Sequence, residues 1–122
     1  MKSYRILATG MLTGIILAVV AACGPAAPQS TALQVAMGDN FRFEPALITV
    51  KVNQPVELEI TSTGALEHNF IAEGLGVSSS NVQGGQSETV AFTPGAAGEY
   101  EFHCNIAGHR EAGMVGKIVV EP

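Results

Sequence analysis

The sequence contains no tryptophan, only two cysteines and only six basic residues among 122. Six basic against eleven acidic residues give a net charge of −5, which argues against a nucleic-acid-binding protein. Because Cys23 and Cys104 lie far apart in the chain, the cysteine content argues against a disulfide scaffold and against a four-cysteine zinc or iron–sulfur site. The length allows one folded domain and leaves no room for a second core.

The first 22 residues have a composition of their own. Lys2 and Arg5 give a basic start, and residues 6–23 carry no charge. This pattern is typical of a secretory signal; a retained anchor over residues 6–23 is the alternative, because eighteen residues are marginally long enough to cross a bilayer. The segment Val20-Ala21-Ala22-Cys23 resembles a bacterial lipobox, which implies cleavage before Cys23 and a lipid on its sulfur. We therefore expect residues 1–22 to be a lipoprotein signal peptide.

Residues 23–31 are predicted to be a flexible tether, because they are rich in proline, alanine and serine and offer nothing to pack. This leaves residues 32–122 as the folded domain. The exported protein would be lipid-anchored on the outer side of the cytoplasmic membrane, in the periplasm or at the cell surface. Without the first 22 residues, four basic and eleven acidic residues remain, a net charge of −7. Such a surface suits a cationic partner or simply keeps the protein soluble, and charge alone does not distinguish the two.

The folded domain shows a hydrophobic period of two. The clearest case is residues 56–60, where Val56, Leu58 and Ile60 alternate with Glu57 and Glu59. Other strands are predicted within residues 33–37, 48–52, 66–72, 88–93, 99–104 and 114–120. The glycine- and serine-rich segment 74–86 is predicted to be a long surface loop, and nothing after the signal has helical periodicity. Short strands at regular spacing predict an all-β sandwich or barrel.

The most specific spacing lies near the C-terminus. Cys104 is followed five residues later by His109, and Met114 comes five residues after that. His68, far upstream, is a fourth candidate. Two imidazoles, one thiolate and a weak thioether are the donors that a mononuclear blue-copper site requires. Zinc would gain nothing from Met114, a binuclear copper centre would need a second thiolate, and a Cys–His hydrolase would leave Met114 without a role.

The segment from Tyr100 to Met114 resembles the ligand loop of the cupredoxins, the small blue-copper proteins such as plastocyanin, azurin, auracyanin and rusticyanin. His68-Asn69-Phe70 is similar to the family's first histidine and its following asparagine, and the resemblance covers residues 33–121. It implies an all-β Greek-key β-sandwich of seven to eight strands. It also implies one copper ion bound by His68, Cys104 and His109, with Met114 as a long axial ligand. Asn69 would form hydrogen bonds behind the ligands, pinning the Cys104 loop and tuning the potential.

The resemblance further implies a one-electron carrier, not an enzyme, that works between redox proteins outside the cytoplasm. We expect a monomer whose donor and acceptor dock near His109, because the residues around it are small or apolar. These residues are Ile106, Ala107, Gly108, Ala112 and Gly113. An extracytoplasmic copper-binding or delivery protein is the alternative function. A nitrite reductase fragment would need a second copper site, for which three histidines are too few.

Two further expectations concern residues near the ligands. His103 adjoins Cys104, but adjacent strand residues point to opposite faces of a sheet, so we expect His103 to point outward with Glu101 and not to bind the metal. The aromatic residues are expected to serve in packing. They are Phe41, Phe43, Phe70, Phe92, Tyr100 and Phe102.

Overall fold

The structure, a computed structural model, describes residues 24–25 and 29–122. The predicted signal peptide, the predicted lipidation site Cys23 and residues 26–28 of the predicted tether lie outside the described residues. In the part of the chain that is described, no helix is both long enough and apolar enough to cross a membrane.

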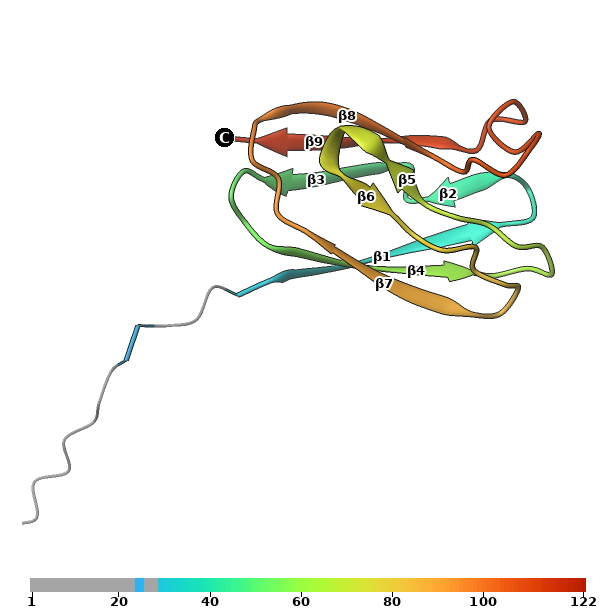
Figure 1. Ribbon diagram of the computed structural model, residues 1–122, viewed down its shortest axis with the longest axis horizontal. Helices are drawn as coiled ribbons and strands as arrows, with labels where there is room; N and C mark the ends of the chain where they lie inside the picture. Colours follow the sequence, from blue (N-terminus) through green and yellow to red (C-terminus); the bar gives the residue numbers. More distant parts are fainter. Residues whose placement is uncertain (1–23, 26–28) are drawn as a thin grey trace, which may run out of the picture.

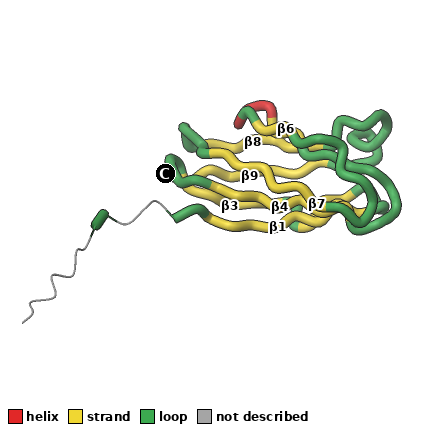
Figure 2. The backbone as a smooth tube through the Cα atoms, turned by 60° about the horizontal axis from the view of Figure 1, so that its bottom comes forward, coloured by secondary structure: helices red, strands yellow, loops and turns green. Residues whose placement is uncertain are grey.

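Two β-sheets pack against each other around one hydrophobic core (Figures 1 and 2). Across the first sheet the order is β2 (Arg42–Glu44), β1 (Thr31–Gly38), β4 (Val56–Ser62) and β7 (Ser87–Phe92). Across the second it is β3 (Leu47–Lys51), β9 (Val115–Glu121), β8 (Gly98–His103), β5 (Ile71–Ala72) and β6 (Val77–Ser78). The predicted all-β Greek-key sandwich is confirmed. The described residues form nine strands instead of seven or eight, because the two-residue strands β5 and β6 complete the edge of the second sheet.

The period-two pattern places alternate side chains in the core. In β4, Val56, Leu58 and Ile60 are buried while Glu57 and Glu59 are exposed. β1 pairs in parallel with β4, and β3 pairs in parallel with β9, so each sheet contains one parallel pair of non-consecutive strands. Because only one face of each strand is apolar, the two sheets can bury their apolar faces only against each other.

The segment predicted as a surface loop, residues 74–86, is partly ordered into regular structure. It contains β6 and most of a short 3-10 helix, η1 (Glu73–Leu75), and it buries Val77 and Val82 in the core. The strand predicted over residues 66–72 is correspondingly shorter: only β5 pairs as a strand, and His68 makes a single antiparallel bridge to Val82. Two buried valines among glycines and serines were too few to reveal this segment by periodicity.

Three buried phenylalanines pack together next to the segments that carry His68 and Cys104. Phe70 and Phe102 stack with their ring centroids 4.6 Å apart, and Phe43 meets Phe102 edge to face at 5.0 Å. All three are at most 2% exposed. Phe70 lies two residues after His68 and Phe102 two residues before Cys104, so the packing of this cluster fixes the backbone on both sides of the candidate ligands.

The loops that carry the candidate ligands gather at one end of the sandwich (Figure 1). The turn after β1, the loop after β4 and the loop between β8 and β9 all lie there. The start of β1 and the C-terminus lie at the opposite end, where Thr31 N–H donates to Pro55 O and Val52 N–H donates to Glu121 O. The chain therefore enters the domain far from the candidate site.

Candidate metal centre

The loop between β8 and β9 closes on itself through the backbone of Met114. Cys104 N–H donates to Met114 O at 3.1 Å, and Met114 N–H donates to His109 O, also at 3.1 Å. Within the loop, Gly108 has φ +85° and Gly113 has φ +104°, a backbone conformation that disfavours residues with a Cβ. Short turns at these glycines bring Cys104, His109 and Met114 close together, although they are spread over eleven positions of the chain.

His68 reaches the same place from the segment between β4 and β5. Its backbone N–H donates to Val82 O at 3.0 Å and its carbonyl accepts from Val82 N–H at 2.7 Å. The donor atoms of His68, Cys104 and His109 all lie within 4.8 Å of one another. His68 Nδ1 is 3.2 Å from His109 Nδ1, and Cys104 Sγ is 3.4 Å from the same nitrogen. His68, Cys104 and Met114 are fully buried, whereas His109 is half-buried.

Comparison with known proteins agrees with this geometry. The family model described as "Cupredoxin-like domain" matches residues 10–120. The chain belongs to the cupredoxin-like family. It is 34% identical over 119 residues to the copper-resistant cuproprotein CopI of Rubrivivax gelatinosus, a match that covers 80% of this chain and 70% of that protein.

Two auracyanin structures are similar in fold to this cupredoxin. Auracyanin A of Chloroflexus aurantiacus is 23% identical, with a TM-score of 0.69 and coverage of 76% of this chain and 100% of that one. The reduced auracyanin of Roseiflexus castenholzii is 24% identical, with a TM-score of 0.68 and coverage of 75% of this chain and 98% of that one. The resemblance recognised in the sequence is therefore confirmed.

The donors fit one copper ion. A thiolate and a thioether favour Cu(I), whereas imidazole binds Cu(II) as well. Two imidazoles, one thiolate and one thioether therefore give a ligand set intermediate between those that Cu(I) and Cu(II) prefer. His68, Cys104, His109 and Met114 are positioned for a single copper site in this cupredoxin. Burial lowers the pKa of His68, which keeps its imidazole in the neutral form that a metal requires.

Asn69 joins the two ligand-bearing segments of the cupredoxin site. Its Nδ2 donates to Asn105 Oδ1 at 2.6 Å and to Asn81 Oδ1 at 2.8 Å, and its Oδ1 accepts from Asn105 N–H at 2.9 Å. Asn69 is 3% exposed. The bonds fix the residue that follows Cys104, so the structure places Asn69 where the sequence predicted it; its effect on the potential stays a prediction.

The turn after β1 contributes contacts that sequence analysis missed. Asp39 Oδ1 lies 3.5 Å from His68 Nε2, and the Phe41 ring meets the His109 ring edge to face at 4.9 Å. Arg42, the first residue of β2, donates from Nη1 to Ala112 O at 3.1 Å. Phe41 therefore does more than pack in the core: it covers a candidate ligand. A Gly-Asp-Asn turn signal stands at residues 38–40, but no sequence pattern connects it to positions 68 and 109.

His103 does not face the ligands, as predicted, but it is not exposed. It lines a hollow with Glu101, Glu73 and Arg110, and its Nδ1 is 3.9 Å from Glu101 Oε1. It lies on the same side as Glu101, as predicted, but it is only 7% exposed, which the strand pattern did not indicate. Of the residues that line the hollow with it, Glu73 belongs to η1 and Arg110 to the loop between β8 and β9.

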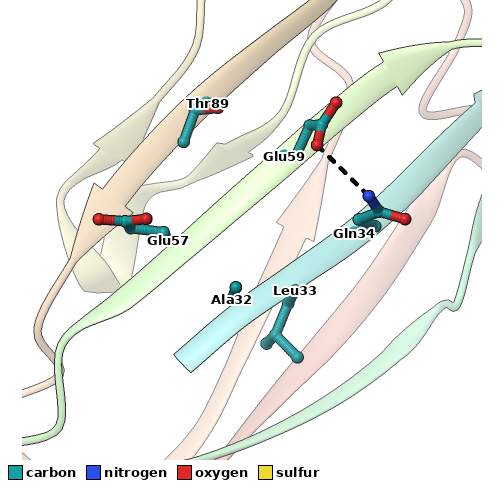
Figure 3. Close-up of a pocket in the computed structure, with 6 residues that line it drawn as sticks. All are labelled: Ala32, Leu33, Gln34, Glu57, Glu59 and Thr89. Carbon is teal, nitrogen blue, oxygen red and sulfur yellow. Dashed lines mark hydrogen bonds between the residues drawn. The ribbon is translucent and has the colours of Figure 1, made fainter. Parts of the chain in front are cut away.

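A second hollow lies on the outer face of the first sheet and is separate from the metal centre (Figure 3). There Gln34 Nε2 donates to Glu59 Oε2 at 3.4 Å. Its lining residues come from β1, β4 and β7 and include none of the candidate ligands; they are Ala32, Leu33, Gln34, Glu57, Glu59 and Thr89.

Asn69→Ala is expected to lower the free energy of unfolding of the metal-free protein by about 1–3 kcal/mol, because it removes a buried amide with three hydrogen bonds. Urea unfolding followed by circular dichroism measures the change. The control is Asn81→Ala, which removes one of those bonds from an exposed residue and should cost less than about 1 kcal/mol. Equal losses for the two variants would contradict the joining role of Asn69.

Proposed function

We propose that this cupredoxin is a one-electron carrier with a mononuclear blue-copper site. In this proposal, His68, Cys104, His109 and Met114 would together hold the ion. The observation that carries it is the tight convergence of three donor atoms within 4.8 Å, two of them on fully buried side chains. The ion would supply the Cu(I)/Cu(II) couple. The loop hydrogen bonds of Met114 and the amide of Asn69 hold the donors in place, which supports a site that rearranges little when an electron moves.

We infer that donor and acceptor proteins dock around His109. Its ring is half-buried and reaches the surface, whereas His68 and Cys104 are fully buried. The neighbouring Ala107, Gly108 and Ala112 are exposed and small, so a partner can approach the imidazole closely. Such a contact suits brief complexes with small interfaces.

A carrier also agrees better with the site than an enzyme does. Among the described residues, one group of three histidine, cysteine or acidic side chains has its donor atoms close enough to share a metal ion, and this is the centre proposed for electron transfer. A copper enzyme of the nitrite reductase kind would need a second centre.

Copper resistance through binding or delivery is the second candidate function. The observation in its favour is the similarity to CopI, whose name describes a copper-resistant cuproprotein. A delivery protein must release its ion to an acceptor, and release is easier from an open site. Here the loop is closed by backbone hydrogen bonds and three candidate ligands are fully buried, which favours retention of the ion.

The two functions differ in what happens to copper during redox cycling. The copper-loaded, oxidised protein is expected to be intensely coloured by charge transfer from the Cys104 thiolate, and repeated reduction and reoxidation against a Cu(I) chelator should return the full colour. Visible absorption and copper analysis measure both. Cys104→Ala should abolish the colour, whereas His103→Gln, which alters the neighbouring residue off the site, should keep it. Loss of copper to the chelator in each reduced state would favour delivery and contradict the carrier function.

We propose that the protein is exported and held at a membrane through lipid on Cys23. The leader composition of residues 1–22 supports export, and the start of β1 lies at the end of the sandwich opposite the metal centre (Figure 1). A lipid upstream of β1 would leave the metal end free for partners.

Intact-mass analysis of the protein extracted from its native membranes is expected to give a mature chain that begins at a diacylglyceryl-modified Cys23. A mass that matches an unprocessed N-terminus would contradict this anchoring.

Ala112→Asp is expected to slow electron exchange between oxidised and reduced copies of the copper-loaded protein about tenfold or more. A carboxylate on the proposed docking surface repels the equally acidic second copy at closest approach, and like charges that face each other across an interface are costly. NMR line broadening measures the exchange rate. The control is Ala97→Asp, which adds the same charge at an exposed position in the loop before β8. If both variants exchange at the same rate with unchanged spectra, docking does not occur around His109.

A further inference from the structure

One atom of the metal centre is left without an ordinary partner. Among the side chains that the structure describes, His68 Nε2 is the fully buried polar atom that makes no hydrogen bond of normal geometry. A buried imidazole N–H without an acceptor is costly, so such an atom needs an explanation. The ring's other nitrogen, Nδ1, faces His109 across 3.2 Å and belongs to the candidate copper site. Nε2 points away from the site, toward the turn after β1.

The group in front of Nε2 is the carboxylate of Asp39. Its Oδ1 lies 3.5 Å from Nε2, and a shift of about half an ångström brings the two atoms to hydrogen-bond distance. The carboxylate is itself held in place: it accepts the N–H groups of Ala65 at 2.8 Å and Leu66 at 3.1 Å. These bonds lower the pKa of Asp39, so the group is ionised at neutral pH.

Gly64 makes this arrangement possible. A Cβ at position 64 would overlap the Asp39 carboxylate, so only glycine lets the carboxylate lie over this loop. The loop that Asp39 binds through residues 65 and 66 leads directly to His68. The same carboxylate thus contacts the ligand ring at Nε2 and the backbone two and three residues before it.

We propose that Asp39 is the positioning residue of His68. It accepts the Nε2 proton, fixes the tautomer in which the Nδ1 lone pair faces the metal, and places a negative charge one imidazole away from the ion. A carboxylate on the outer nitrogen of a ligand histidine makes the imidazole more basic and sets its orientation. The added charge stabilises the dication more than the monocation, so it lowers the reduction potential. The proposal rests on the copper site of the proposed function but not on the electron-carrier role or its partners.

The alternative is that Asp39 only closes the backbone turn at residues 65 and 66. Both roles predict that replacement of Asp39 destabilises the protein, so stability does not separate them. They differ in the protonated nitrogen of His68 and in the relative affinity for the two copper ions, because a role confined to the turn alters neither.

The first measurement is on the wild-type protein and needs no variant to fold. ¹⁵N NMR of the metal-free protein is expected to show His68 protonated at Nε2 and unprotonated at Nδ1. A proton on Nδ1, or an equal mixture of tautomers, would overturn the proposal. The same spectrum of Asp39→Asn should show a mixture, since the amide replaces the ionised acceptor by a weaker one.

The second measurement compares two variants that remove the same charge. Cu(I) and Cu(II) affinities are determined by competition with chelators for Asp39→Asn and for Glu67→Gln, whose exposed carboxylate adjoins His68 in sequence but is bonded to Gln83. Asp39→Asn is expected to lower the ratio of Cu(II) to Cu(I) affinity about tenfold, equivalent to a rise in potential of about 59 mV for one electron. Glu67→Gln should change the ratio less than twofold. Equal shifts in the two variants, or no shift in Asp39→Asn, would overturn the positioning role.

Discussion

The arrangement of the candidate ligands at one end of this cupredoxin depends on the reciprocal hydrogen bonds between Asn69 and Asn105. The two residues are 36 positions apart, and each follows directly after a candidate ligand, His68 or Cys104. A buried amide that donates to one segment and accepts from it fixes distance and orientation at once. With those hydrogen bonds made, the loop bonds of Met114 need only hold residues 104–114 together. The donor set is thus held by two separate groups of hydrogen bonds, one from the Asn69 side chain to Asn105 and one between the backbones of Cys104 and Met114.

The hydrogen bonds between Asn69 and Asn105 are supported by a buried aromatic cluster in the chain next to both residues. Phe70 and Phe102 stack directly under the two segments, and Phe43 closes the cluster from the first sheet. Packed aromatic rings resist displacement, since any shift opens a void. The same residues that stabilise the sandwich therefore set the spacing of the ligands. Stability and metal geometry cannot be varied independently at these positions.

The features that could be predicted from sequence are those written in local patterns. The alternation at residues 56–60 gave the strand and its buried face, and the spacing of Cys104, His109 and Met114 gave the loop. His68 followed from its Asn-Phe neighbours through family resemblance. Contacts between turns carry no such pattern. Asp39 reads as an ordinary turn residue, and only the folded chain brings it to 3.5 Å from His68. His103 was predicted on the correct face, but its burial was not predicted, because the hollow that it lines includes Glu73 and Arg110 from other segments.

The two histidines of the site are not equivalent, because His68 lies in the interior and His109 lies at the surface. His68 is fully buried and has a fixed carboxylate behind its outer nitrogen. His109 is half-buried, with an aromatic edge from Phe41 beside it and small exposed residues around it. The Asp39 carboxylate faces the buried His68 ring on one side and solvent on the other, since its side chain is 39% exposed, so salt screens its charge in part. In the proposed function, residues behind His68 would therefore influence the reduction potential without lying on the proposed docking surface. In the proposed function, the small exposed residues around His109 would decide how closely a partner can approach the ring.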